Sequence, residues 1–106
     1  MSDKPVMGFA WYDERSFDAL RQAMPDMSER YDDWRTGATR DVKRAEKEGY
    51  RVIRVAVRPE EFFAWCQKRG IGQYGMGLQA RRLFAADRAQ LIVRAERMTK
   101  KRFSFF

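Results

Sequence analysis

The sequence contains no histidine and only one cysteine, Cys66. Without an imidazole group, the chain cannot build a Ser-His or Cys-His pair and has no imidazole ligand for a metal ion. A single cysteine cannot form a disulfide within the chain, which agrees with a reducing compartment. We therefore predict a protein that is not an enzyme and needs no cofactor, although carboxylates, arginine and tyrosine remain available as acids or bases.

The sequence also has no apolar run near the roughly 18 residues that cross a bilayer, and no basic start followed by an apolar segment. This predicts a cytoplasmic protein without a membrane partner. Neither a low-complexity linker nor an internal repeat divides the 106 residues, of which 44% are hydrophobic and 14% aromatic. A chain of this size and composition can bury its own core. We predict one domain over residues 1–106 that ends in a basic, Phe-rich C-terminal tail at residues 99–106.

Charge is unevenly distributed along the chain, and the formal net charge is +7. Residues 1–50 carry nine Lys or Arg against eleven Asp or Glu, whereas residues 51–106 carry thirteen against four. A positive field concentrated in one part of a protein attracts polyanions and speeds their encounter, and salt screens it. The second half therefore indicates an anionic partner such as nucleic acid or an acidic protein, although a basic surplus can also serve solubility alone.

A short strand and a short helix are expected near the N-terminus. From Met7 to Tyr12 the side chains alternate between two faces, which is typical of a strand. Ser16 is a candidate N-cap for a helix over residues 17–24, because its hydroxyl can accept a hydrogen bond from a free amide of the first turn. Pro25 would end this helix, since the residue before a proline is displaced from helical angles.

A longer amphipathic helix is predicted at about residues 28–48. Asp26 and Glu29 have the spacing of a capping box, and Gly49 stands where a left-handed residue ends a helix. Gly37 within the helix indicates a kink or a close contact with another helix. The apolar stripe consists of Tyr31, Trp34, Ala38, Val42 and Ala45. The opposite, polar face carries Asp33, Arg40, Lys43, Arg44 and Lys47.

The second half predicts a strand followed by two helices. From Tyr50 to Arg58 the apolar residues recur with period two, so we expect a strand with one buried side. Pro59 suits the first position of a helix that would run to Arg69 and close at Gly70. After a glycine-rich loop, Leu78 to about Met98 can form one long helix. Residues 91–97 begin with the run Leu-Ile-Val and could instead be a strand, because short apolar runs are ambiguous.

These elements give the order β-α-α-β-α-α, a mostly helical α+β domain with a small sheet of two or three strands. A lone strand leaves its backbone groups unpaired, so the strand at 51–57 needs a partner. The candidates are the strand at 7–12, the tail at 102–106, and the same strand in a second copy of the protein, which would give a symmetric dimer. We favour the N-terminal strand.

A glycine-rich loop, Gly70-Ile-Gly-Gln-Tyr-Gly-Met-Gly77, joins the last two predicted helices. Its first letters match a dinucleotide-binding turn, but such a turn follows a strand, and here a helix precedes the loop. The loop is therefore interpreted as a flexible or tight helix connection. An alternative is that free amides at the start of the following helix, near Gly75 and Gly77 and flanked by Arg81 and Arg82, hold a phosphate or another anion.

Arginines of the last helix form the leading candidate site. Phosphate contact requires basic groups that follow a nucleic-acid backbone, and arginines at helical spacing, with a basic tail beyond them, meet that requirement. The candidate contact residues are Arg81, Arg82, Arg88, Arg94, Arg97, Gly75 and Gly77. The alternative is a solvated helix face on which arginine stems cover apolar surface.

Two further features have structural explanations. Cys66 falls late in its helix on the apolar stripe, so it is expected to be a buried thiol and not a nucleophile. Four carboxylates lie near the start of the second predicted helix, where such groups ordinarily cap the helix or compensate its dipole and seldom bind Mg²⁺. They are Asp26, Glu29, Asp32 and Asp33.

Three segments stand out in the second half of the chain: Val57-Arg-Pro-Glu-Glu-Phe-Phe-Ala-Trp-Cys66, Gly70-Ile71, and Arg81-Arg-Leu-Phe-Ala-Ala-Asp-Arg-Ala89. They resemble a group of small bacterial proteins with no established activity. An aromatic pair like Trp11-Tyr12 and a Tyr-x-x-Trp segment like Tyr31 to Trp34 also recur in the group. The resemblance covers about residues 9–90 and implies a bacterial cytosolic protein. The longer basic, Phe-rich tail is unusual for the group.

The sequence favours a small non-enzymatic binding or regulatory protein that contacts nucleic acid or another polyanion. The alternative is a protein-interaction module, or a homodimer, that docks an acidic partner and buries its Phe-rich tail. The polyanion hypothesis requires the guanidinium groups of the last third of the chain to lie together, outward and unpaired.

Overall fold

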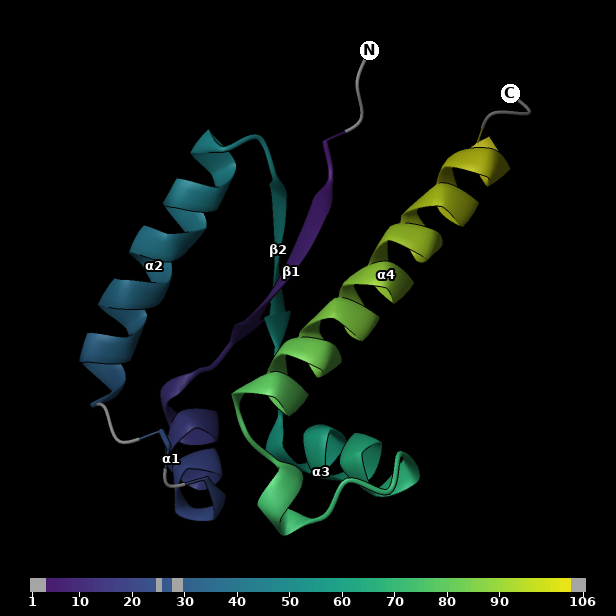
Figure 1. The fold of residues 1–106 in the computed structure, drawn as a ribbon. Coiled ribbons are helices and arrows are strands. Elements are labelled where there is room, and N and C mark those ends of the chain that lie inside the picture. Colours follow the sequence, from purple (N-terminus) through teal and green to yellow (C-terminus); the bar gives the residue numbers. More distant parts are fainter. Residues whose placement is uncertain (1–3, 25, 28–29, 104–106) are drawn as a thin grey trace.

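The computed structural model describes residues 4–24, 26, 27 and 30–103, and this part of the chain forms four α-helices and a two-stranded sheet in an α+β fold (Figure 1). The order of strands and helices is the predicted one. The elements are β1 (Val6–Trp11), α1 (Glu14–Ala23), α2 (Tyr31–Lys47), β2 (Arg51–Ala56), α3 (Pro59–Lys68), the 3-10 turn η1 (Gln73–Gly75) and α4 (Leu78–Phe103).

The sheet consists of β1 and β2 in parallel, in a register that runs from Val6 opposite Arg51 to Trp11 opposite Ala56. The N-terminal strand is therefore the partner of β2, as predicted. Parallel strands cannot be joined by a hairpin and need a longer crossover, which α1 and α2 supply.

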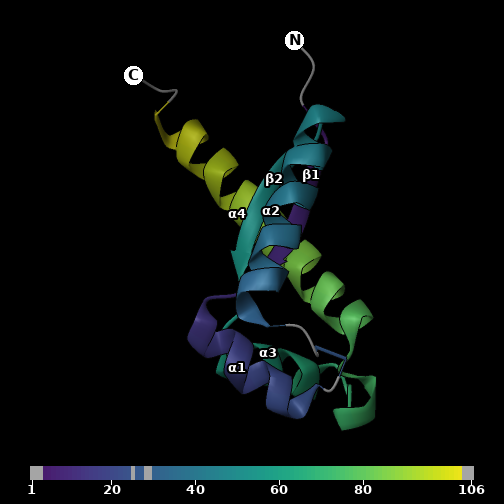
Figure 2. The same ribbon diagram turned by 90° about the vertical axis from the view of Figure 1, so that its left-hand side faces the viewer.

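Helices cover both faces of this small sheet. In Figure 1, α2 lies on one side of the strands and α4 on the other, while α1 and α3 lie below, at the end where the strands finish. Figure 2 shows α4 crossing the strands obliquely behind the sheet. This arrangement gives the sheet two apolar faces, and it leaves each strand one edge without a partner strand in the described residues.

The main core lies where α4 and α3 meet β2 and α1. Phe62 of α3 and Phe84 of α4 are both buried and meet edge to face, with ring centroids 5.5 Å apart. Val55 and Val57 contribute from the end of β2, and Leu20 from α1. Burial of side chains of this size stabilises a fold by about 2–3 kcal/mol each relative to exposure, so this cluster holds the helices on the sheet.

Gly8 allows α4 to approach the sheet closely. A Cβ atom at Gly8 would lie only 2.4 Å from the backbone oxygen of Ala85 and 2.8 Å from the Cβ of Ala89. The other side of β1 faces α2, where the rings of Trp11 and Trp34 lie 5.3 Å apart. The alternation predicted for this segment is thus explained: its small residues lie under α4 and its large ones against α2.

The start of α1 differs from the prediction. The helix begins at Glu14, and the carboxylate of Asp13 accepts a hydrogen bond from the amide of Ser16 at 2.7 Å. Ser16 is therefore buried in the first turn and is not the N-cap. Asp and Ser are comparable caps. Asp13 precedes Ser16 in the sequence, so capping by Asp13 makes the helix about one turn longer. The same bond holds the pKa of the Asp13 carboxyl below its ordinary value.

The predicted capping box of α2 is also wrong. Arg30 occupies the N-cap position without a side-chain cap, and Asp26 binds Arg81 instead; Glu29 lies outside the described residues. The glycine that ends α2 has the expected left-handed backbone, with φ of 101° at Gly49. Gly37 was expected to mark a kink or a close helix contact; no close contact is found at Gly37 itself, since the nearest atom that an added Cβ would meet is Nη2 of Arg40 at 3.7 Å.

Residues 78–103 form one continuous helix, so residues 91–97 are helical. The first five positions of the basic tail, 99–103, continue this helix, and residues 104–106 lie outside the described part. No helix in the described residues combines the length and apolar character needed to cross a membrane.

Candidate functional site

Arg81 does not lie outward as the polyanion hypothesis requires. Its side chain is only 6% exposed, and its guanidinium group donates to Oδ2 of Asp26 at 2.7 Å and to the sulfur of Met24 at 3.0 Å. The hydrogen bond from Arg81 also holds the pKa of the Asp26 carboxyl below its ordinary value. Both partners directly follow α1, so the Arg81 side chain points into the protein. Arg81 therefore has a structural role: it links α4 to the segment that follows α1.

Tyr12, which directly follows β1, lies beside the buried Arg81. Tyr12 is buried, and burial raises the pKa of its hydroxyl, while the neighbouring Arg81 guanidinium opposes that shift. The backbone oxygen of Tyr12 accepts a hydrogen bond from the hydroxyl of Tyr31 at 3.1 Å. Helix α4, the end of β1 and the start of α2 are thus connected through polar contacts beside the core.

Arg88 is also partnered, whereas three other candidate arginines are exposed. A guanidinium nitrogen of Arg88 lies 3.7 Å from a carboxylate oxygen of Glu61, and its central carbon lies 5.1 Å from the ring centroid of Phe84. The exposed side chains of Arg82, Arg94 and Arg97 form no ion pair within the part of the chain that the structure describes. The seven candidate residues therefore do not form one continuous anion-binding row.

The two candidate glycines have their amides occupied. The amide of Gly75 donates to the backbone oxygen of Gly72 at 2.9 Å, and the amide of Gly77 donates to that of Gly75 at 3.0 Å. The backbone oxygen of Gly77 in turn accepts from the amide of Arg81 at 3.1 Å. These bonds close the loop into a tight helix connection, as the first interpretation predicted, and leave neither glycine amide to bind an anion.

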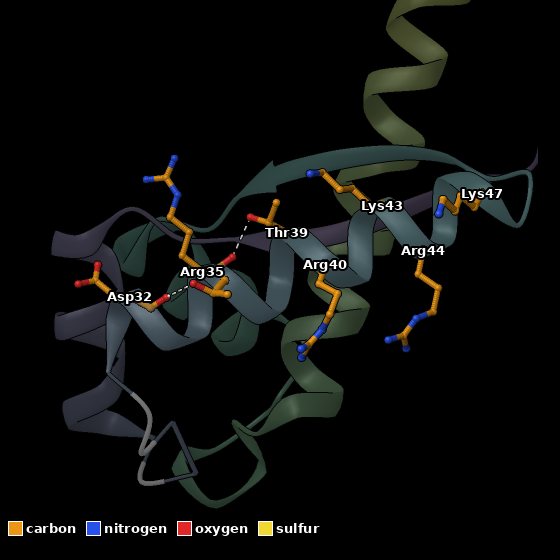
Figure 3. Close-up of a pocket in the computed structure, with 8 residues that line it drawn as sticks. Asp32, Arg35, Thr39, Arg40, Lys43, Arg44 and Lys47 are labelled. Carbon is orange, nitrogen blue, oxygen red and sulfur yellow. Dashed lines mark hydrogen bonds between the residues drawn. The ribbon is translucent and has the colours of Figure 1, made fainter.

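A stronger concentration of positive charge lies on α2, in the half of the chain with the acidic balance. Five exposed cationic side chains stand out from this helix, and together we name them the basic face of α2 (Figure 3). They are Arg35, Arg40, Lys43, Arg44 and Lys47. With Asp32, Thr36 and Thr39 they border one shallow depression of the surface.

The other groups of this face do little to neutralise it. Among the described residues, the only ion pair of these cations joins Arg44 to Asp41 at 4.0 Å, and both side chains are at least half exposed. Such a surface pair contributes little energy. The hydroxyls of Thr36 and Thr39 donate back to the α2 backbone, to the carbonyl oxygens of Asp32 and Arg35. The cations are therefore the groups that an approaching ligand meets.

The basic face spans most of α2. From the first to the last cation, the helix rises by about 18 Å at 1.5 Å per residue. Four of the cations, Arg40, Lys43, Arg44 and Lys47, follow the i, i+3, i+4, i+7 spacing that places residues on one side of a helix. This spacing was visible in the sequence. The acidic net charge of the first fifty residues gave no sign of a basic surface there, because most of their carboxylates lie outside this face.

A second surface feature lies between α2 and α4, along the edge of β1 that β2 does not use. This cleft, which we name the edge cleft, has a volume of about 910 Å³. Its floor is formed by residues 7–10 of β1, and its walls include Asp33, Gly37 and Arg40 of α2 and Leu78 and Arg82 of α4.

The remaining candidates are structural. Cys66 is fully buried, and burial raises the pKa of its thiol, as expected for an unreactive core cysteine. The carboxylates Asp32 and Asp33 lie in the first turn of α2. Among the described residues no three Cys, Asp or Glu side chains lie close enough to hold a metal ion together.

Comparison with known families, with curated proteins and with solved structures found no match in any of the three searches.

Proposed function

We propose that this protein is a non-enzymatic binding protein of the cytoplasm that holds the phosphate backbone of nucleic acid against the basic face of α2. The observation that carries the proposal is the set of five exposed cations along a single helix, four of which share one side, with one weak ion pair to them, from Asp41, in the described residues. Arginine and lysine contacts to phosphate fix the position of a nucleic acid without reading its bases. Binding is therefore tolerant of sequence.

Binding should depend steeply on salt, because each neutralised phosphate releases a condensed counterion. If four or five cations contact phosphates of a duplex, the logarithm of the association constant falls with the logarithm of salt concentration with a slope of about −4. Between 50 and 200 mM salt the affinity for a fluorescein-labelled DNA duplex then drops by about two orders of magnitude, measured by fluorescence anisotropy. No binding at low salt, or a slope near zero, would contradict the proposal.

The location of the site can be separated from the effect of net charge. We expect the triple variant Lys43→Gln, Arg44→Gln, Lys47→Gln to bind the duplex about 30-fold more weakly, with a slope smaller by about 3. Glutamine forms helices nearly as well as lysine and arginine, so α2 should stay intact. Circular dichroism checks the fold.

A second triple variant, Arg82→Gln, Arg94→Gln, Arg97→Gln, is the matched control. It removes the same amount of charge from exposed positions of α4, and we expect its affinity to change by less than about threefold. Equal losses in the two variants would show that net charge alone governs binding. A larger loss in the α4 variant would place the site on the last helix.

A further inference from the structure

Helix α3 covers one face of α4 over little more than a single turn. The rings of Phe62 and Phe84 meet edge to face with centroids 5.5 Å apart, and Nε1 of Trp65 donates to Asp87 at 3.1 Å. Residues 89–103 of α4 lie beyond these contacts, since the helix continues to its end at Phe103. In Figure 1 this part of α4 rises away from α3.

The same face of α4 carries exposed apolar side chains beyond α3. Leu91, Ala95 and Met98 follow Phe84 at successive intervals of seven, four and three residues, so they lie on the side of the helix that packs on α3. Leu91 is 49% exposed and Met98 67%. Ile92, also exposed, widens this face at one margin. We name Leu91, Ile92, Ala95 and Met98 the apolar stripe of α4.

The shape of the stripe fits a second helix. The small side chain of Ala95 leaves a hollow between the larger Leu91 and Met98, and such hollows accept a side chain of a helix packed 8–10 Å away. A flat lipid surface does not fit, because α3 lies on the same side of α4 and stands above it by about one helix diameter, roughly 10 Å.

The carboxylates near the stripe already have cationic partners. Helix α4 carries eight Lys or Arg but only two carboxylates, Asp87 and Glu96. Glu61 of α3 also reaches α4, whereas Glu60 lies on the opposite side of α3, because the contacts with α4 come from positions 61, 62, 65 and 69. The ion pairs are Asp87 with Arg69 at 3.4 Å, Glu96 with Arg51 at 2.7 Å and Glu61 with Arg88 at 3.7 Å.

Two cations beside the stripe remain available to a partner. Arg94 and Arg97 are exposed and form no ion pair within the described residues. Over residues 94–103 the sequence has five Lys or Arg against one Asp or Glu, and that carboxylate is Glu96, which binds Arg51. Two copies packed stripe to stripe would therefore bring like charges together, which opposes association. The charge favours an acidic partner.

We propose that the apolar stripe of α4 binds an acidic amphipathic helix of another protein. Apolar residues of that helix would cover Leu91, Ala95 and Met98, and carboxylates beside them would pair with Arg94 and Arg97. Recognition of one helix face by another uses apolar anchors at such spacing. The stripe is separate from the basic face of α2, so the proposal does not depend on contact with nucleic acid.

The first test lets the protein choose the charge of its partner. The full chain selects from a displayed library of helix-forming peptides of about 18 residues, with leucine at the a and d positions and Glu, Lys or Gln elsewhere. Such a helix is about 27 Å long and can cover the stripe. We expect enriched peptides to carry Glu in preference to Lys. No enrichment, or equal use of Glu and Lys, would overturn the proposal.

The second test locates the bound peptide, because an acidic helix is also attracted to the basic face of α2. The methionine methyl groups of the protein are labelled with ¹³C, and a selected peptide is added. The methyl resonance of Met98 should shift, whereas that of Met24, which is buried beside Arg81, should not. A bound peptide that leaves Met98 unchanged would contradict the proposed site.

An apolar substitution tests the stripe itself. Leu91→Gln should weaken binding of the selected peptide about tenfold, because it removes an anchor from the centre of the contact. Leu83→Gln is the matched control: Leu83 is 59% exposed on the same helix but lies outside the stripe. It should retain binding within about threefold. Equal losses would refute the stripe, and circular dichroism checks both folds.

A charge reversal tests the acidic character of the partner. Arg94→Glu should weaken peptide binding about tenfold, whereas Arg82→Glu, the same change at an exposed position outside the stripe, should alter it less than about threefold. The α2 triple variant should also retain peptide binding, even where it loses nucleic acid. Equal losses for Arg94→Glu and Arg82→Glu would overturn the proposal.

Two measurements without peptide test the other occupants. Vesicles with one third phosphatidylglycerol, a proportion of about 33%, should not sediment the protein. Sedimentation that Leu91→Gln abolishes would assign the stripe to a lipid surface. Light scattering should give the mass of one chain. A dimer that becomes a monomer in Leu91→Gln would assign the stripe to a second copy, and either result would overturn the proposal.

Discussion

Replacement of Gly8 by alanine is expected to destabilise the protein by about 3 kcal/mol, at the upper end of the range for overpacked cores. The added Cβ would lie 2.4 Å from the backbone oxygen of Ala85. A flexible side chain could turn away from such a contact, but a helix backbone must shift as a whole. Because α4 also carries Phe84 of the main core, the shift would loosen packing beyond the sheet. Urea denaturation measures the loss.

The same substitution at Gly37 is the matched control, with the opposite sign. Gly37 lies within α2, and an added Cβ would meet nothing closer than Nη2 of Arg40 at 3.7 Å. Alanine should therefore stabilise the protein by about 0.5–1 kcal/mol, because it restricts the unfolded chain and favours helix. If Gly8→Ala proved as stable as the wild type, the close packing of α4 on β1 would be refuted.

Removal of the Asp26 carboxylate is expected to cost about 2–3 kcal/mol. The change Asp26→Ala leaves the buried guanidinium group of Arg81 without its ion-pair partner, and loss of one partner of a buried pair is strongly destabilising. The estimate lies below the full range for buried pairs because the Asp26 side chain is 49% exposed. The double variant Asp26→Ala, Arg81→Met removes both charges and should recover most of the loss.

The pair should also leave a signature in the pH dependence of stability. Arg81 lowers the pKa of Asp26 in the folded protein, so this contribution is complete above the ordinary carboxyl pKa of about 4. It is lost as the pH falls through the lowered folded value. The free energy of unfolding should therefore fall less steeply in acid for Asp26→Ala than for the wild type. Parallel curves would show that the ion pair does not stabilise the fold.

Periodicity in the sequence predicted much of the fold. Alternation at residues 7–12 and 51–57 identified both strands, and the need of each for a partner predicted their pairing. Gly49 and Gly70 marked helix ends because both adopt positive φ. These signals depend only on residues near one another in the sequence, and the structure contains both strands and both helix ends. The caps were harder to predict: Asp13 and Ser16 are both good caps close together, and the choice depends on which helix length packs best.

The site was harder to predict because helical spacing shows which residues share a face but not which face is buried. Arg81 and Arg88 share a face, and that face packs against the rest of the protein. Asp26 had a local interpretation as a cap, yet its partner lies 55 residues away in the sequence. The cations of α2 were recognised as the polar face of a helix. Their importance becomes evident only in the structure, where Arg81 and Arg88 of α4 already have ion-pair partners.

The position of β1 has a consequence for the order of folding. The residues that pair with this strand begin at Arg51, and those that cover Gly8 are Ala85 and Ala89. Closure of such long loops costs chain entropy before the contacts stabilise anything, which slows folding. On the ribosome, β1 is synthesised before β2 and α4, so it is expected to pack in its final position only after α4 has emerged.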